Sequence, residues 1–237
     1  MKKLRVDIWS DVMCPFCYIG KRHFEAALSA FPHAGNVEVK WRSFQLDPGM
    51  KTDPESTVFE YLAKKKGFSH AQSVDMHRHV TDMAAKAGLE YHFENAVPAN
   101  SFRAHRLIQL AKETGRDDQL EELLFKAYFT EGKNIDDTAV LQTLADEAGL
   151  DKNAGENSAL PQYAEAVQED IGTASELGIS GVPFFIFDGK YAVSGAQPVP
   201  VFTDALEKAF ENWQKNNPDA ILLSGEGPSC APGEDCA

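Results

Sequence analysis

The stretch Cys14-Pro15-Phe16-Cys17 decides the fold of this chain, because it separates a predicted strand from a predicted helix. Between residues 4 and 9, apolar and polar side chains alternate, which is typical of a half-buried strand. Between residues 24 and 31, apolar side chains recur at helical spacing. We therefore expect both thiols at the turn that ends the strand and begins the helix.

Two cysteines at a helix N-terminus favour redox chemistry. The helix dipole and the unpaired backbone N–H groups of the first turn stabilise a thiolate. We expect Cys14 to be the exposed nucleophile, and Cys17 to resolve a mixed disulfide by attacking the Cys14 sulfur. A CxxC motif can also be half of a zinc site or two idle core thiols. The strand before the motif and the helix after it disfavour both alternatives.

The composition is that of a soluble globular protein, with 43% hydrophobic and 25% charged residues in a chain of 237. The net charge of −13 argues against a nucleic-acid partner and against an anionic membrane. No apolar run reaches the roughly 18 residues of a membrane span. The basic start is followed by charged residues instead of an apolar signal core. We therefore predict a cytoplasmic protein, in which a CxxC motif is more often catalytic than structural.

The elements are expected in the order βαβ, a helical block, and ββα. The first unit has strands over residues 4–9 and 37–44 and a helix over 17–31. Asp53-Pro54 is expected to open the first helix of the block, which Gly67 ends. Five more helices are expected, with starts or apolar faces near residues 69, 100, 120, 136 and 160. Strand patterns return at 182–187 and 191–194 around Asp188-Gly189, and Pro198 introduces a last helix. The fold class is therefore α/β, a four-stranded mixed sheet flanked by helices and interrupted by a helical insertion.

Pro183 stands directly before an apolar strand, so it must lie at a strand start or edge. A cis bond would turn the backbone N–H and C=O of Val182 toward the CxxC turn. There they could hold an extended substrate segment by strand-like hydrogen bonds. A trans proline that merely opens a strand is the usual case, because only about 5–6% of X-Pro bonds are cis. The companion CxxC motif is what favours the cis form.

These motifs together resemble the thioredoxin superfamily, and the long helical insertion resembles that of DsbA. Residues 11–21, 182–187 and 194–197 are similar to the FrnE-like branch of DsbA. The resemblance implies a discontinuous thioredoxin-like domain over residues 1–48 and 178–213. It implies a helical insertion domain over residues 49–177 and leaves a cysteine-containing tail over 214–237.

The same resemblance implies a protein thiol–disulfide oxidoreductase without cofactor or metal. Its substrate groove would be formed by Pro15, Phe16, Val182 and Pro183. The substrates would be protein dithiols or disulfides, and glutathione or a thioredoxin-type reductant would be the redox partner.

Two other functions share this architecture or fit the helical block. The fold resembles 2-hydroxychromene-2-carboxylate isomerases and kappa-class glutathione transferases, and Asn100-Ser101 with Arg106 looks like a helix start that those enzymes use near their substrate. In that branch a serine commonly occupies the position of Cys14 and the second cysteine is absent, so this sequence departs from it twice. The other alternative is a binding or chaperone module that uses the helical block without redox turnover.

Asp11 and a second cysteine pair are further candidates for the redox chemistry. Asp11 could relay the proton of Cys17, although a carboxylate in such a turn is more often a solvated or capping residue. Cys230 and Cys236 could form a second redox pair that exchanges with Cys14, a passive local disulfide, or two idle thiols. Five residues separate them, which disfavours a zinc site.

The histidines give weaker signals. His77 and His79 are two positions apart on a predicted helix and do not face each other, so they make a poor chelate and are expected on a solvated face. His105 begins an apolar helix, and we expect it to be a hydrogen-bonding histidine of the core or of the domain interface, with a groove-lining role as the alternative.

Overall fold

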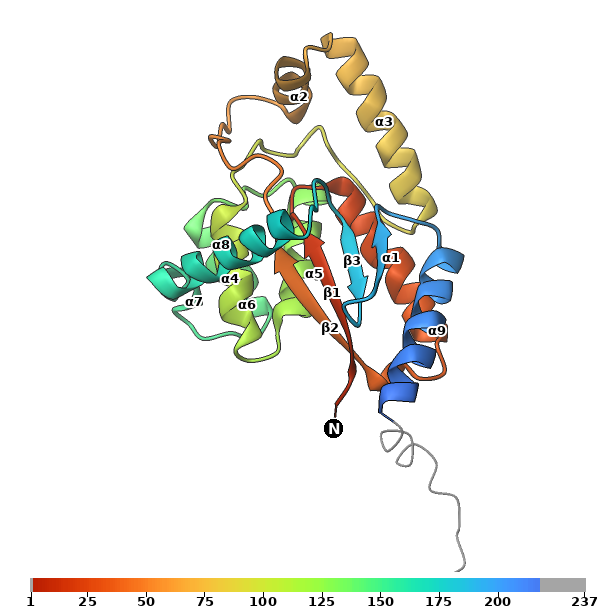
Figure 1. Cartoon of the computed structure of the whole chain (residues 1–237). Coiled ribbons are helices and arrows are strands. Elements are labelled where there is room, and N and C mark those ends of the chain that lie inside the picture. Colours follow the sequence, from red (N-terminus) through yellow and green to blue (C-terminus); the bar gives the residue numbers. More distant parts are fainter. Residues whose placement is uncertain (1, 218–237) are drawn as a thin grey trace, which may run out of the picture.

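The computed structural model describes residues 2–217, in which four strands form one mixed sheet (Figure 1). The strands are β1 (Leu4–Ser10), β2 (Val37–Ser43), β3 (Phe184–Phe187) and β4 (Tyr191–Ser194). Their order is β2-β1-β3-β4, with β1 parallel to β2 and antiparallel to β3, and β3 antiparallel to β4. The predicted four-stranded mixed sheet is confirmed.

Each face of the sheet is covered by helices, because side chains alternate along a strand. The apolar side chains of β1 at even positions pack with Phe185 and Phe187 against α1 (Pro15–Ala30) and α9 (Val199–Asn216). On the opposite face, Trp9 packs with Ala174 of α8 (Pro161–Glu176). The CxxC motif follows β1 and begins α1. Its two cysteines pack in the same hydrophobic core as the helical block.

The helical block lies between β2 and β3 in the sequence. Besides α8, its helices are α2 (Val58–Lys66), α3 (His70–Lys86), α4 (Phe102–Lys112), α5 (Asp117–Phe129), α6 (Thr138–Glu147) and α7 (Ala154–Asn157). Figure 1 shows α2 and α3 at one end of the sheet, and α4, α6, α7 and α8 beside β2. Within residues 2–217, no helix combines the length and the apolar composition needed to cross a membrane. The predicted helical insertion is confirmed.

The expected start of the first block helix at Pro54 is wrong. Residues 53–57 form a turn, and α2 begins at Val58 after the N-cap residue Thr57. The Thr57 hydroxyl accepts a hydrogen bond from the Glu60 N–H, and the Glu60 carboxylate accepts one from the Thr57 N–H. This reciprocal capping satisfies the backbone N–H groups of Thr57 and Glu60, and it fixes the start of the helix at Val58. The short α7 was not predicted.

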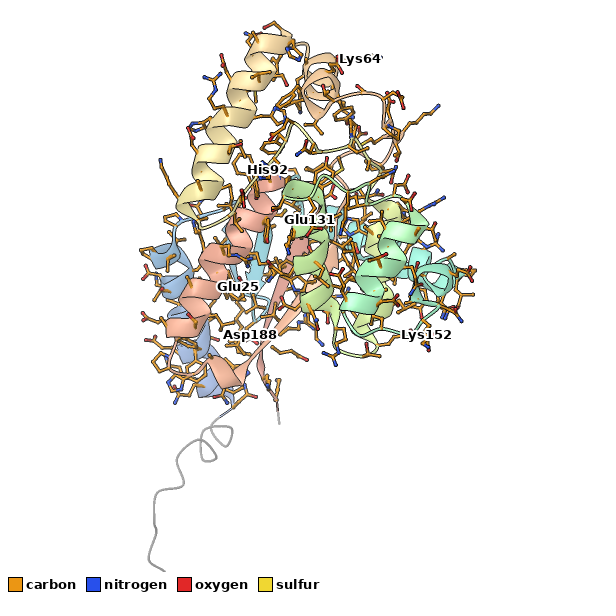
Figure 2. All side chains as sticks on the ribbon, turned by 180° about the vertical axis from the view of Figure 1, so that it is seen from behind. Glu25, Lys64, His92, Glu131, Lys152 and Asp188 are labelled. Atoms are coloured by element: carbon orange, nitrogen blue, oxygen red, sulfur yellow. The ribbon has the colours of Figure 1, made fainter. Side chains whose placement is uncertain are left out.

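Charged side chains fasten the helical block to the thioredoxin-like part. Buried Lys21 on α1 lies 3.1 Å from a Glu122 oxygen and 3.6 Å from an Asp118 oxygen, both on α5. Figure 2 views the molecule from behind and shows α1, with Glu25, alongside α5. At β2, buried Asp170 of α8 accepts a hydrogen bond from the Ser43 N–H at 3.0 Å. The cysteines therefore sit on a helix that is tied to the block along its length.

The approach of α1 to the start of β3 depends on Gly20. A Cβ at residue 20 would lie 2.9 Å from Cγ of Pro183 and 3.5 Å from Cα of Ala196. The first distance is too short for an unstrained fit and the second is an ordinary van der Waals contact, so a side chain at residue 20 would press against Pro183. Gly20 thereby sets the distance between the helix that carries the cysteines and Pro183.

Replacing Gly20 by alanine is expected to destabilise the fold by about 1–2 kcal/mol, although alanine favours a helix by about 1 kcal/mol over glycine. The overpacking against Pro183 outweighs the gain in helix propensity. Gly172 on α8 is the matched control, because a Cβ there would meet nothing within 4 Å. Urea denaturation should show Gly172→Ala unchanged or more stable; equal effects of the two substitutions would contradict the packing argument.

Candidate active site

The CxxC motif forms the first turn of α1. Cys14 is the N-cap residue and Pro15 occupies the first helical position, where its missing N–H costs no hydrogen bond. The Cys14 N–H donates to the Asp11 carbonyl at 2.8 Å, and the Cys17 N–H donates to the Cys14 carbonyl at 3.0 Å. Both cysteines are free thiols. The turn holds them side by side at the helix N-terminus, as expected from the sequence.

Cys14 is buried, so the expectation of an exposed nucleophile is wrong. Its exposed fraction is 3%, and that of Cys17 is 1%. Both sulfurs belong to the hydrophobic core that α1 shares with the helical block. The sequence around the motif does not predict this burial, because the residues that cover the cysteines lie elsewhere in the chain.

The Val182–Pro183 peptide bond is cis, and Val182 lies against the motif. The Cys14 thiol donates to the Val182 carbonyl, with 3.6 Å between sulfur and oxygen. Pro183 is buried against α1 at Gly20, and its carbonyl accepts a hydrogen bond from the Gly195 N–H at 2.8 Å. Residues far apart in the sequence thus meet at the Cys14 sulfur.

A pocket of about 750 Å³ opens on another side of Cys14. Its wall combines the CxxC turn, the loop after β2 and the α2–α3 pair. Phe93 and Tyr128 complete it from other parts of the helical block. The lining residues are Met13, Cys14, Pro15, Phe16, Leu46, Asp47, Val58, Tyr61, Leu62, Lys65, Lys66, Asp75, Met76, His77, His79, Val80, Phe93 and Tyr128. Of the expected groove residues, Pro15 and Phe16 line this pocket, whereas Val182 and Pro183 do not.

Aromatic side chains support the motif from behind. The Tyr91 hydroxyl donates to the Pro15 carbonyl at 2.8 Å. Tyr18, next to Cys17, stacks on Phe125 of α5 with ring centroids 4.8 Å apart. Tyr91 was not identified from the sequence, because nothing in the residues around it indicates that its hydroxyl reaches the motif.

Asp11 is fully buried and organises the turn before Cys14. Its carboxylate accepts hydrogen bonds from the Leu46 N–H at 2.8 Å and the Met13 N–H at 3.4 Å. His105 Nε2 lies 3.3 Å from the same carboxylate. His105 is therefore the buried, hydrogen-bonding histidine that was expected. The role of Asp11 as a proton relay stays a prediction.

His77 was expected on a solvated face, and this prediction is wrong. Its ring is half-buried between Phe59 and Phe93, with centroid distances of 4.9 and 4.7 Å, and burial lowers its pKa. His79 is exposed. Among residues 2–217, no group of three or more histidine, cysteine or acidic side chains could hold a metal ion. Cys230 and Cys236 lie outside the described residues.

Glu121 was missed in the sequence and is the unexpected polar group behind the motif. It lies on α5 with an exposed fraction of 1%, and the Ser10 hydroxyl donates to its carboxylate at 2.8 Å. Burial raises its pKa to about 7, although His105, Ser10 and Lys21 oppose that rise. A signal was present: Glu121 shares a helical face with Phe125 and Tyr128, where an acid is not expected.

Cys17, the second thiol of the motif, is 1% exposed. Ser10 and the backbone of Asp11 act to lower the pKa of Cys17. Burial is the larger effect, and together with the neighbouring Cys14 it raises the pKa of Cys17 well above its ordinary value. The second thiol of the motif is thus buried and held as a neutral thiol.

The raised pKa of Glu121 makes stability depend on pH. Between an unfolded pKa of 4.5 and a folded pKa of about 7, the unfolded state is ionised and the folded state is not. The free energy of unfolding therefore falls as pH rises through this window. Because Glu121→Gln removes the titration, its stability relative to the wild type should rise by up to about 3 kcal/mol between pH 4.5 and pH 8.

Urea denaturation of both proteins at a series of pH values measures this difference. Glu122→Gln is the control, because ion pairing lowers the pKa of Glu122 and leaves it ionised throughout the window. Wild-type and Glu121→Gln stabilities that stay parallel from pH 4.5 to 8 would mean that Glu121 does not titrate in the folded protein near neutral pH.

Comparison with known proteins assigns the chain to a family. The model of the DSBA-like thioredoxin domain matches residues 5–207. The chain is similar to the uncharacterized protein YwbO of Bacillus subtilis (strain 168), with 32% identity over 90% of this chain and 98% of that protein. It is also similar to the crystal structure of a probable DsbA oxidoreductase, SCO1869 from Streptomyces coelicolor. That likeness has a TM-score of 0.82 and 38% identity over 99% of this chain and 96% of the other.

A more distant solved structure shares the fold alone. It is the cytosolic disulfide reductase DsbM from Pseudomonas aeruginosa, with a TM-score of 0.63 and 18% identity over 88% of this chain and 100% of that one. The residues that match the family model include the whole mixed sheet except the first residue of β1, and the whole helical insertion. This chain belongs to the family of DSBA-like thioredoxin domains.

Proposed function

We propose that this chain is a protein thiol–disulfide oxidoreductase in which Cys14 is the nucleophile and Cys17 the resolving thiol. The observation that carries the proposal is the placement of two free thiols in the first turn of α1, with Cys14 also opening onto a large apolar pocket. The family membership supports the same chemistry. The finer resemblance to the FrnE-like branch and the cytoplasmic location stay predictions.

The reaction is a two-electron exchange between the dithiol and a protein disulfide. The Cys14 thiolate attacks one substrate sulfur, forms a mixed disulfide and releases the first substrate thiolate. Cys17 then attacks the Cys14 sulfur, which forms the Cys14–Cys17 disulfide and releases the second substrate thiolate. The dithiol is oxidised and the substrate disulfide is reduced. The reverse sequence oxidises a substrate dithiol.

The substrate segment would contact two surfaces beside Cys14. The backbone of Val182, whose carbonyl lies 3.6 Å from the Cys14 sulfur, can pair with an extended segment. The apolar pocket can take a bulky side chain next to the substrate cysteine, because most of its lining residues are apolar or aromatic. Lys66 and Asp75 also line the pocket and offer contacts to polar groups of the same segment.

Glutathione is a candidate reductant for the oxidised enzyme. The DsbM fold, at 17% identity and a TM-score of 0.63, has also been solved with GSH. That likeness supports glutathione as a partner worth testing beside a thioredoxin-type protein. The tail pair Cys230 and Cys236 is proposed as a second route for electrons to Cys14.

Substitution of the two cysteines separates their roles. Cys14→Ser should reduce insulin-disulfide reduction to the uncatalysed rate with glutathione as reductant, because no nucleophile remains. Cys17→Ser should instead accumulate a mixed disulfide on Cys14, which intact-mass measurement detects. The variants are made with Cys230→Ser and Cys236→Ser also present. Slower turnover of that background alone would support the tail relay, and turnover by Cys14→Ser would contradict the proposed nucleophile.

The same variants distinguish the two rival functions. A chaperone or binding module would keep its ability to suppress aggregation in Cys14→Ser. An isomerase or glutathione transferase would convert a small substrate without disulfide exchange. The residues that suggested that branch serve the fold here: the Asn100 amide donates to the Met50 carbonyl at 2.8 Å, and Arg106 Nε donates to the Ser158 carbonyl at 2.7 Å. We therefore favour the oxidoreductase.

A charged side chain introduced into the pocket should weaken the binding of protein substrates more than that of small disulfides. Met76 lines the pocket and is 45% exposed, so Met76→Glu can be made without burying a charge in the core. Loss of one apolar contact of about 1–2 kcal/mol predicts a KM for insulin raised about tenfold, with kcat nearly unchanged.

The control for the pocket is Leu160→Glu, because Leu160 is 47% exposed and does not line it. The reduction of a small aromatic disulfide by Met76→Glu serves as the second reference and should stay within about twofold of wild type. An unchanged KM for insulin in Met76→Glu would remove the pocket from the substrate site.

A further inference from the structure

The apolar pocket beside Cys14 is lined by two polar side-chain atoms that have no partner. One is Nε2 of His77 on α3, and the other is Oη of Tyr128 on α5. Neither atom has a hydrogen-bond partner among residues 2–217, and neither is enclosed by protein atoms. Polar atoms left open in an apolar pocket are the groups that orient a ligand and give specificity.

The contacts of His77 decide which kind of hydrogen bond Nε2 can make. Nδ1 lies 2.8 Å from the Ser73 carbonyl, which can only accept, so Nδ1 carries the proton. Burial lowers the pKa of His77, so the ring is neutral at pH 7. Nε2 is therefore an acceptor without a proton. The contacts with Phe59 and Phe93, at centroid distances of 4.9 and 4.7 Å, fix the orientation of the ring.

Tyr128 supplies a donor to the same pocket. Its exposed fraction is only 3%, and its ring packs edge-on against Phe129 with 4.9 Å between centroids. Burial raises the pKa of Tyr128 above its ordinary value, so the hydroxyl keeps its proton at neutral pH and can donate it in a hydrogen bond. The pocket thus presents one acceptor and one donor on two different helices.

The other polar groups of the lining are engaged with protein atoms or exposed. The Tyr61 hydroxyl donates to the Asp47 carboxylate, and Lys65 pairs with the same carboxylate. Asp75 pairs with Arg78 on its own helix. The remaining ionisable side chains that line the pocket are exposed: Lys66 and His79. His77 and Tyr128 are therefore the polar groups best placed to select a ligand.

We propose that the pocket selects substrate segments that carry a tyrosine next to the reacting cysteine, and that Tyr128 and His77 recognise the hydroxyl of that tyrosine. The inference rests on the proposed dithiol chemistry and names the class of segment on which it acts. A hydroxyl both accepts and donates, so it can accept from Tyr128 and donate to His77. An indole N–H only donates, and an ionised carboxylate only accepts.

The lining also favours an aromatic ring as the carrier of that hydroxyl. Phe16, between the two cysteines, is 38% exposed and lines the pocket together with Phe93. Aromatic rings attract one another in edge-to-face and offset contacts beyond the effect of buried area. A serine or threonine would bring the hydroxyl without filling the apolar space. A phenylalanine would fill the space but cover both polar atoms without pairing them.

Matched peptides test the selection of tyrosine. Each is a short peptide closed by one disulfide, and the members of a pair differ only in Tyr or Phe directly before, or directly after, the first cysteine. The full-length chain reduces them with glutathione as reductant, and kcat/KM is measured for each. In at least one pair, the Tyr peptide should be reduced about tenfold more efficiently, because its hydroxyl gains two neutral hydrogen bonds.

His77→Phe and Tyr128→Phe each remove one polar atom and keep a ring. The ratio of kcat/KM for the Tyr and Phe peptides should fall to about threefold in each variant and to about one in the double variant. Because the ratio is taken within one variant, a general loss of activity cancels. Tyr191→Phe is the matched control, since Tyr191 lies on β4 and does not line the pocket. It should keep the activity and the tenfold ratio of the parent.

The outcomes separate the selection from the chemistry. A parent chain that reduces none of the peptides contradicts the proposed oxidoreductase function. A parent that reduces Tyr and Phe peptides equally well overturns the selection of tyrosine and leaves the function standing. A preference that survives in both His77→Phe and Tyr128→Phe overturns the assignment to these two residues. The substitutions are independent, so if one of them prevents folding, the other still decides.

Discussion

The packing of α1 against two different cores is the constraint on which the rest of the structure depends. Its first turns, with Cys17, Tyr18 and Ile19, belong to the core of the helical block, whereas Phe24 and Ala27 belong to the core of the sheet. One rigid helix therefore couples the two parts of the chain. Any change in how the block sits on the sheet moves both sulfurs relative to the Val182 carbonyl. The helical insertion is thus part of the redox site.

Among the buried acids, Asp170, Asp11 and Glu121 differ in the hydrogen-bond donors that surround their carboxylates. Asp170 accepts hydrogen bonds from Ser43, Gln109 and Arg42, so its burial is repaid by several donors. Asp11 is similarly supplied by backbone N–H groups. The Glu121 carboxylate accepts one hydrogen bond, from the Ser10 hydroxyl, and burial raises its pKa to about 7.

The features that short sequence patterns encode were predictable, and those that depend on distant pairs were not. Alternation and helical spacing located β1 and α1 with the cysteines between them, and Asp188-Gly189 located the β3–β4 turn. The burial of Cys14, the pocket under α2 and α3, and the need for Gly20 depend on contacts between distant segments. Glu121 was hidden for the same reason. Its position on an apolar helical face is visible in the sequence, but its partner Ser10 is 111 residues away.

The burial of Cys14 affects access and chemistry in opposite directions. Cys14 is 3% exposed and lines the pocket, so access to its sulfur is restricted. The same cover keeps water away from Cys17, where desolvation favours the neutral thiol over the thiolate.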